Sequence, residues 1–178
     1  MPCLSLRLLA GSLVLVTALA ARADEAEDVG NPEKKIKEYG AAVEKSPDDA
    51  DLWINLGLAH SKAKNHAEAA KAFAKAVELK ADDGRAHYWL GRALADQKKT
   101  SEAITHFAEA ARLEKPEAGE EASTMYVDAQ SRLGKAYMDA EKWDDSIAAY
   151  KAALGGKPAD PAPFYNQLGA AYLMKGDA

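Results

Sequence analysis

Cysteine is almost absent from this chain of 178 residues, whose one thiol is Cys3. A lone thiol cannot form an internal disulfide, and the chain beyond the N-terminus has no thiolate nucleophile and no cysteine metal ligand. β-Branched residues are also few, whereas alanine is abundant. This composition favours helix over strand, because alanine loses no rotamer freedom when it enters a helix.

Motifs that carry chemistry are missing as well. The sequence has no His-Glu-x-x-His zinc motif, no Gly-x-Ser-x-Gly nucleophile elbow, no phosphate-binding glycine loop and no Cys-x-x-Cys-His haem site. Among the histidines we expect His60 and His87 to pack in the interior and His106 to be exposed. We therefore expect no enzymatic activity, no metal site and no cofactor.

The first 23 residues have the order of a secretory signal peptide. Arg7 precedes an apolar run from Leu8 to about Ala20, and Ala21-Arg22-Ala23 is a small-x-small cleavage pattern. The run is shorter than the roughly 20 residues of a membrane-spanning helix. We predict cleavage after Ala23, a periplasmic or secreted location, and no membrane span in the mature chain. Retention of the segment as an N-terminal anchor is the alternative.

Positive charge is in the minority. Lys and Arg number 23 against 28 Asp and Glu, a formal net charge of −5. Loss of Arg7 and Arg22 with the signal peptide would lower the first number to 21 and the net charge to −7. Phosphate contacts need a basic surface, so we expect no nucleic-acid partner.

A Leu-Gly pair recurs at spacings of 34, 43 and 35 residues, and small and aromatic residues accompany it at matched offsets. The first unit contains Trp53, Leu56, Gly57, His60, Ala69, Phe73, Ala76 and Leu79. The second contains His87, Leu90, Gly91, Leu94, Ala103, Phe107, Ala110 and Leu113. The third contains Leu133, Gly134, Tyr137, Ser146, Tyr150, Ala153 and Pro158, and the fourth Tyr165, Leu168, Gly169 and Tyr172.

These residues resemble the tetratricopeptide repeat family, whose 34-residue pattern places Trp, Leu-Gly, Tyr, Ala, Phe, Ala and Pro at the same offsets. The resemblance implies an all-α fold, an α-solenoid of stacked antiparallel helix pairs. We predict a short linker over 24–30 and a repeat domain over 31–178. Within the domain we expect a lone second helix at 31–46, repeats at 50–83, 84–117 and 127–161, an insertion at 118–126, and a half repeat at 162–178.

The long second spacing exceeds the family period by nine residues. The surplus falls in Glu114–Ser123, which includes Pro116, Gly119 and four glutamates. It corresponds to a longer loop between repeats or to a longer first helix in the third unit. Surface loops accept extra length at small entropic cost, so a tolerated insertion is one interpretation, and an acidic finger that contacts a partner is the other.

The resemblance also implies that the first helices line a concave groove whose exposed positions contact a peptide. The candidate positions are Asn55, Arg85, Tyr88, Arg92, Arg132, Lys135 and Asn166. Four of them are positive in an acidic chain, so the groove would accept a peptide carboxylate or an acidic segment, with Tyr88 offering a flat apolar contact. A solvated helix face with ordinary salt bridges is the alternative.

The leading prediction is a non-catalytic scaffold of the cell envelope that binds a protein or peptide partner in this groove. One alternative is that the chain is the repeat portion of a larger envelope protein or enzyme, cut at residue 178. Another is a structural subunit that forms a homo-oligomer through its C-terminal helix. That helix would leave an apolar surface made by Tyr165, Leu168, Tyr172, Leu173 and Met174.

Overall fold

The computed structural model describes residues 31–117 and 120–176, and every regular element in these ranges is an α-helix. The helices are α2 (Pro32–Lys45), α3 (Ala50–Lys62), α4 (His66–Leu79), α5 (Gly84–Asp96), α6 (Thr100–Leu113), α7 (Thr124–Asp139), α8 (Trp143–Gly155) and α9 (Ala162–Lys175). The predicted signal peptide and linker lie outside the described residues. Helix α2 falls within the range predicted for a lone second helix.

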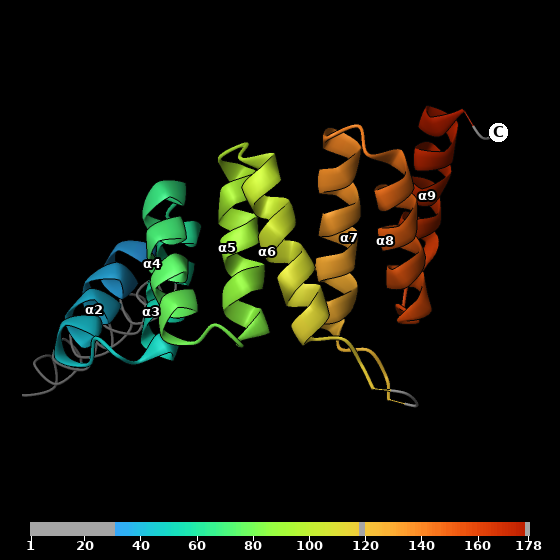
Figure 1. Cartoon of the computed structure of the whole chain (residues 1–178). Coiled ribbons are helices and arrows are strands. Elements are labelled where there is room, and N and C mark those ends of the chain that lie inside the picture. The colour runs from blue at the N-terminus through green and yellow to red at the C-terminus, as the bar shows by residue number, and fades with distance from the viewer. Residues whose placement is uncertain (1–30, 118–119, 177–178) are drawn as a thin grey trace, which may run out of the picture.

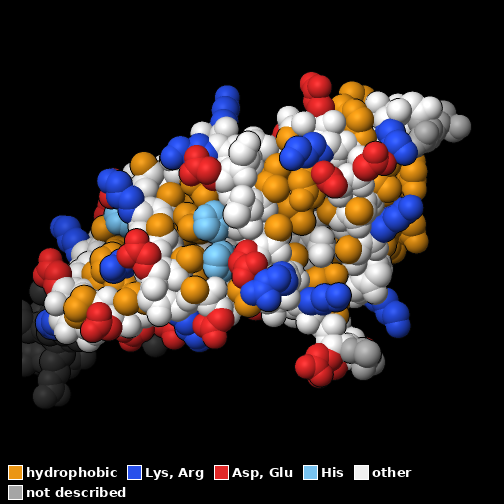
Figure 2. Space-filling model, viewed as in Figure 1, with side chains coloured by type: hydrophobic (Ala, Val, Ile, Leu, Met, Phe, Trp, Pro, Cys, Tyr) orange, Lys and Arg blue, Asp and Glu red, His pale blue; other side chains and the backbone are white. Residues whose placement is uncertain are grey.

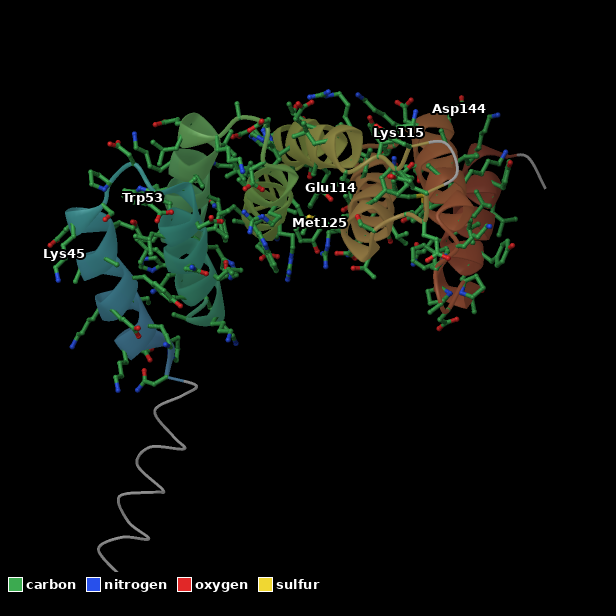
Figure 3. The ribbon with its side chains drawn as sticks, turned by 90° about the horizontal axis from the view of Figure 1, so that it is seen from below. Lys45, Trp53, Glu114, Lys115, Met125 and Asp144 are labelled. Atoms are coloured by element: carbon green, nitrogen blue, oxygen red, sulfur yellow. The ribbon has the colours of Figure 1, made fainter. Side chains whose placement is uncertain are left out.

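Each helix packs against the next one along the chain, so the helices form a single row from α2 to α9 (Figure 1). The first helices also touch one another, because α3 contacts α5, α5 contacts α7 and α7 contacts α9. No comparable contact joins α4 to α6 or α6 to α8 in the described part of the chain. The row therefore bends toward the first helices, and α3, α5 and α7 lie on the inner side of the arch (Figure 3). The predicted all-α solenoid is confirmed.

Within each complete helix pair, the glycine of the Leu-Gly motif lies against an aromatic ring of the second helix. The contacts join Gly57 to Phe73, Gly91 to Phe107 and Gly134 to Tyr150. A Cβ atom at these glycines would lie 2.5, 2.9 and 2.9 Å from the nearest ring atom, closer than real Cβ atoms come. The rings are 0, 2 and 1% exposed. The missing side chain is what allows the two helices to close over the ring.

The turns repeat as faithfully as the helices do. Asp49, Asp83 and Ser123 cap α3, α5 and α7, and each side chain accepts hydrogen bonds from backbone N–H groups of the first turn. The second helices instead follow a residue with positive φ, at Lys64 (60°), Lys98 (61°) and Glu141 (58°). The same strained turn thus joins the two helices of each complete pair.

The nine surplus residues divide between a loop and a helix extension. Residues 115–117 and 120–123 belong to a connection that projects from the body between α6 and α7 (Figure 1). Helix α7 has 16 residues, whereas α3 and α5 have 13 each. Of the two structural interpretations, the longer loop and the longer first helix, the chain uses both.

We expect Gly57→Ala to lower the free energy of unfolding by about 1–3 kcal/mol, because the new methyl group overpacks against the buried ring of Phe73. Gly155→Ala is the matched control, since a Cβ there meets nothing within 4 Å. The control should leave stability unchanged or raise it by less than about 1 kcal/mol. Urea unfolding followed by circular dichroism measures both, and equal effects would contradict this account of the helix pair.

Candidate functional site

The predicted groove residues all lie on first helices, and the central ones meet. Asn55 is on α3, Arg85, Tyr88 and Arg92 are on α5, Arg132 and Lys135 are on α7, and Asn166 is on α9. Tyr88 and Arg132 are joined by a hydrogen bond of 3.1 Å between Tyr88 Oη and Arg132 Nε. No hydrogen bond or ion pair joins Asn55 or Asn166 to this group within the described ranges. The structure thus concentrates the candidates on α5 and α7.

Tyr88 does not offer the flat apolar contact predicted for it. The residue is only 6% exposed, because its ring packs between Trp89 and Phe107 with centroid distances of 5.1 and 6.2 Å. Its hydroxyl donates a hydrogen bond to the carboxylate of Asp128 on α7. Burial and this hydrogen bond raise the pKa of Tyr88, so the phenol stays a neutral donor. The residue joins two repeats rather than facing a ligand.

Arg132 shares the same carboxylate. Its Nε lies 2.9 Å from Oδ2 of Asp128, and its guanidinium carbon is 5.7 Å from the centroid of the Tyr88 ring. Burial opposes the charged form of Arg132, but the hydrogen bonds and charge interactions with Asp128 and Tyr88 together outweigh burial and raise the pKa of the guanidinium. About four-tenths of the Arg132 side chain remains exposed, at 38%. Its charge is partly compensated, yet it is still accessible to a partner.

Arg85 lies between two carboxylates. Its Nη2 is 2.6 Å from Oδ1 of Asp51 on α3 and 2.7 Å from Oδ2 of Asp83, the residue that caps α5. The hydrogen bonds to Asp83 and Asp51 raise the pKa of Arg85 above its usual range. The guanidinium therefore holds α3 to α5 and contributes no net positive charge to the groove. For Arg85 the salt-bridge alternative describes the geometry.

Arg92 is the other arginine of α5, and it forms no ion pair with a carboxylate of the described residues. Its guanidinium carbon lies 4.7 Å from the centroid of the Trp89 ring, within cation–π range. Trp89 in turn stacks on Phe73 at 6.3 Å, so the ring has a rigid support and is half-buried. Trp89, beside Tyr88, is also one of the groove positions that the repeat offsets give for α5. It lies four residues after Arg85 and three before Arg92, a spacing that places the three side chains on one helix face.

Lys135 is exposed and has no carboxylate within ion-pair distance in the described chain. Together with Arg132, it lines two neighbouring pockets. One pocket, of about 160 Å³, is lined by Ala95, Asp96, Thr100, Ala103, Phe107, Arg132, Lys135, Ala136 and Asp139. The other, of about 240 Å³, is lined by Asp128, Ser131, Arg132, Lys135, Tyr150, Pro163, Phe164 and Gln167. Both pockets therefore offer a cation together with an apolar surface.

A larger pocket of about 640 Å³ lies elsewhere, where the loop before α7 meets the end of α8. Glu120 and Glu121 are among its lining residues, and Lys157 is its one cation. It shares no residue with the two pockets on α7. The proposed acidic finger formed by this loop stays a prediction.

The histidines differ from expectation at one position. His106 is half-buried rather than exposed, because its Nδ1 lies 3.1 Å from Nδ1 of His87 on the neighbouring helix. Two histidine side chains lie side by side near the middle of the molecule in Figure 2. Burial and the His87 ring lower the pKa of His106. Within the described residues no three His, Cys, Asp or Glu side chains are grouped to hold a metal ion.

We expect Tyr88→Phe to lower the free energy of unfolding by about 1–2 kcal/mol, because it removes a hydrogen bond to a carboxylate that joins α5 to α7. Tyr126→Phe is the control, since the Tyr126 hydroxyl has no hydrogen-bond partner in the described structure and its loss should cost less than about 0.5 kcal/mol. Chemical denaturation compares the two variants. A Tyr88 effect no larger than the Tyr126 effect would show that this bond does not stabilise the stack.

None of the helices that the structure describes is both long and apolar enough to cross a membrane.

Among curated proteins, none matches this sequence. Two crystal structures of MamA are similar to it, each with a TM-score of 0.74 and 25% identity. They cover 86% of this chain and 79% and 84% of their own chains. BtubC (BKLC) from P. vanneervenii shares the fold, with a TM-score of 0.71, 21% identity, and coverage of 92% of this chain and 74% of its own.

A family model described as "Tetratricopeptide repeat" matches residues 20–84, 65–118 and 128–178. The first match begins at residue 20, so it includes the last four residues of the predicted signal peptide. Together the matches cover most of the chain, and they agree with the stacked helix pairs and the glycine–aromatic contacts. Members of this family bind protein partners and are generally non-catalytic. The chain belongs to the tetratricopeptide repeat family.

Proposed function

We propose that the chain is a non-catalytic scaffold that holds a protein or peptide partner on its concave face. We further propose that the partner presents acidic side chains or a free carboxylate to the cationic surface, which we define as Trp89, Arg92, Arg132 and Lys135. The observation that carries this proposal is that two cations on the inner side of the arch, Arg92 and Lys135, form no ion pair with a carboxylate of the described residues.

The charge pattern supports an acidic partner. The chain has a net charge of −5, so acidic side chains outnumber basic ones. Arg85, for example, is neutralised by ion pairs with Asp51 and Asp83. A cation that faces a groove without a carboxylate keeps its hydrogen-bond donors free for a ligand. Arg92 and Lys135 come from adjacent repeats, so an extended segment crossing from α5 to α7 would meet both.

The surface also offers apolar contact, which charge alone would not provide. Trp89 is held by Phe73 and lies under Arg92, and the pocket beyond Lys135 includes Phe164 and Tyr150. Tryptophan and arginine are the residue types most often responsible for binding energy at protein interfaces. A segment with an acidic residue followed by an apolar one fits this order of contacts.

We also propose that the scaffold is exported and acts in the periplasm or outside the cell. The support is the order of Arg7, the apolar run after it, and the small-x-small pattern that ends at Ala23.

We expect Arg92→Glu and Lys135→Glu each to weaken binding of acidic peptides by about tenfold or more, because like charges then face one another across the interface. The probe is a set of labelled peptides that differ in the number of Asp and Glu and carry either a free or an amidated C-terminus. Fluorescence anisotropy measures affinity, and affinity should fall as salt rises.

Arg112→Glu is the matched control for that experiment. Arg112 lies on the second helix α6, is 66% exposed and pairs with Glu109, so its reversal makes the same charge change away from the concave face. Binding by this variant should equal that of the unchanged chain. Equal losses in all three variants, or no preference for acidic peptides, would contradict a site at the cationic surface.

For export, we expect the chain recovered from a bacterial host to begin at Asp24, as measured by intact mass and N-terminal sequencing. Ala23→Leu should block this cleavage, because the peptidase site requires a small residue there. The same substitution at Ala20, within the apolar run, is the control and should leave cleavage unaffected. An unprocessed chain in the cytoplasm would contradict the proposed location.

A further inference from the structure

Each end of the stack holds half of a helix pair. Helix α2, at the N-terminal end, is a second helix that packs on α3 and has no first helix of its own among the described residues. Helix α9, at the opposite end, is a first helix that packs on α8 and α7 and has no second helix there (Figure 1). Within the described residues, the N-terminal end therefore has a second helix without its first helix, and the C-terminal end has a first helix without its second helix.

The face of α9 that a second helix would cover is open. A Cβ atom at Gly169 would meet nothing within 4 Å, whereas at the equivalent glycines of the three complete pairs it would strike an aromatic ring. The apolar side chains around this gap are exposed, with Tyr165 at 60%, Leu173 at 68% and Met174 at 60%. Hydrophobic surface gathers along the edge formed by α9 in Figure 2. No aromatic ring of the described residues covers Gly169.

Helix α2 carries a ring at the matching offset. Tyr39 occupies the position of the aromatic residues that are at most 2% exposed in the complete pairs, and Ala42 occupies the position of alanines that are 0% exposed there. The equivalent residues are Phe73, Phe107 and Tyr150 for the ring, and Ala76, Ala110 and Ala153 for the alanine. In α2 both Tyr39 and Ala42 are only half-buried. Part of the Tyr39 ring packs against the cluster of Val43, Leu56 and Ala72, so the rest of the ring, together with Ala42, is the complement of the gap at Gly169.

We propose that α9 of one copy packs against α2 of a second copy, with the Tyr39 ring of the second copy lying on Gly169 of the first. The contact completes a tetratricopeptide pair between two chains. It is heterologous, because each copy uses a different surface, and it therefore joins copies head to tail, in open rows or in rings, rather than in two-fold dimers. This inference is independent of the cationic surface, and the concave faces of successive copies remain uncovered.

Lys35 is the position where the match is imperfect. The complete pairs have Ala69, Ala103 or Ser146 at this offset, each 0% exposed. The ammonium group of Lys35 lies 3.0 Å from Glu38 and 5.7 Å from the Tyr39 ring centroid, so its stem must run to the rim to keep the charge in water. We therefore expect a weak, concentration-dependent association that Lys35→Ala strengthens.

The test uses the full-length chain as its host produces it, studied by sedimentation velocity over a range of concentrations. Gly169→Ala should weaken association by about tenfold or more, because its methyl group would meet the partner's ring as it would in the complete pairs. The same change leaves the isolated fold intact, since nothing lies near that Cβ. Gly155→Ala on α8 is the matched control and should associate like the unchanged chain.

A mixing experiment identifies the second surface. Ala42→Glu should block the α2 side as Gly169→Ala blocks the α9 side, and circular dichroism confirms that both variants fold. Each variant alone should be monomeric. Their mixture should form dimers that grow no further, because the intact α9 of one variant pairs with the intact α2 of the other and both outer ends of that dimer are blocked. Dimers formed by Ala42→Glu alone would mean that α9 pairs with itself and would overturn the proposal. A chain that is monomeric at every concentration would overturn it as well. Another segment of the same chain, or a different protein, would then cover α2 or α9.

Discussion

The contact between a glycine on one helix and an aromatic ring on the next is the constraint on which the rest of this structure depends. A backbone without a side chain lets the ring lie flat against it, so the two helices approach until the ring is almost fully buried, as at Gly57 and Phe73. Because the same contact recurs in three pairs, the pairs have the same shape and stack in register. The first helices then lie closest together, and the stack bends toward them.

That bend decides which side chains are available for recognition. Much of the inner face is already engaged in holding repeats together, through Arg85 with Asp51 and through Tyr88 with Asp128. These bonds fix the angle between neighbouring repeats, so they shape the groove without competing for a ligand. The cations left over, Arg92 and Lys135, stand on a surface that is preorganised by the bonded pairs beside them, which lowers the entropic cost of binding.

The fold could be predicted from the sequence because its determining contacts are periodic. Leu-Gly motifs, followed at a fixed distance by an aromatic residue, imply the helix pairs and their stacking. The ion pair of Asp51 with Arg85 was also within reach, since residues 34 positions apart occupy equivalent places in successive repeats. The predictions for Tyr88 and His106 were wrong because both side chains are held by contacts from other helices: Phe107 and Asp128 contact Tyr88, and His87 contacts His106. The nine surplus residues before α7 break the 34-residue spacing between the second and third units. The contact between Tyr88 and Asp128 could therefore not be predicted from residues 34 positions apart.

A row in which each helix touches only its near neighbours does not have one uniform stability. Helices α2 and α9 each bury a single residue, Val43 and Ala171, whereas α5 buries eight. Local opening should therefore begin at the two ends and reach α5 and α6 last, so that amide hydrogens exchange in that order. The arch is thus most persistent where α5 adjoins α7, and its ends are the parts that gain most order from anything packed against them.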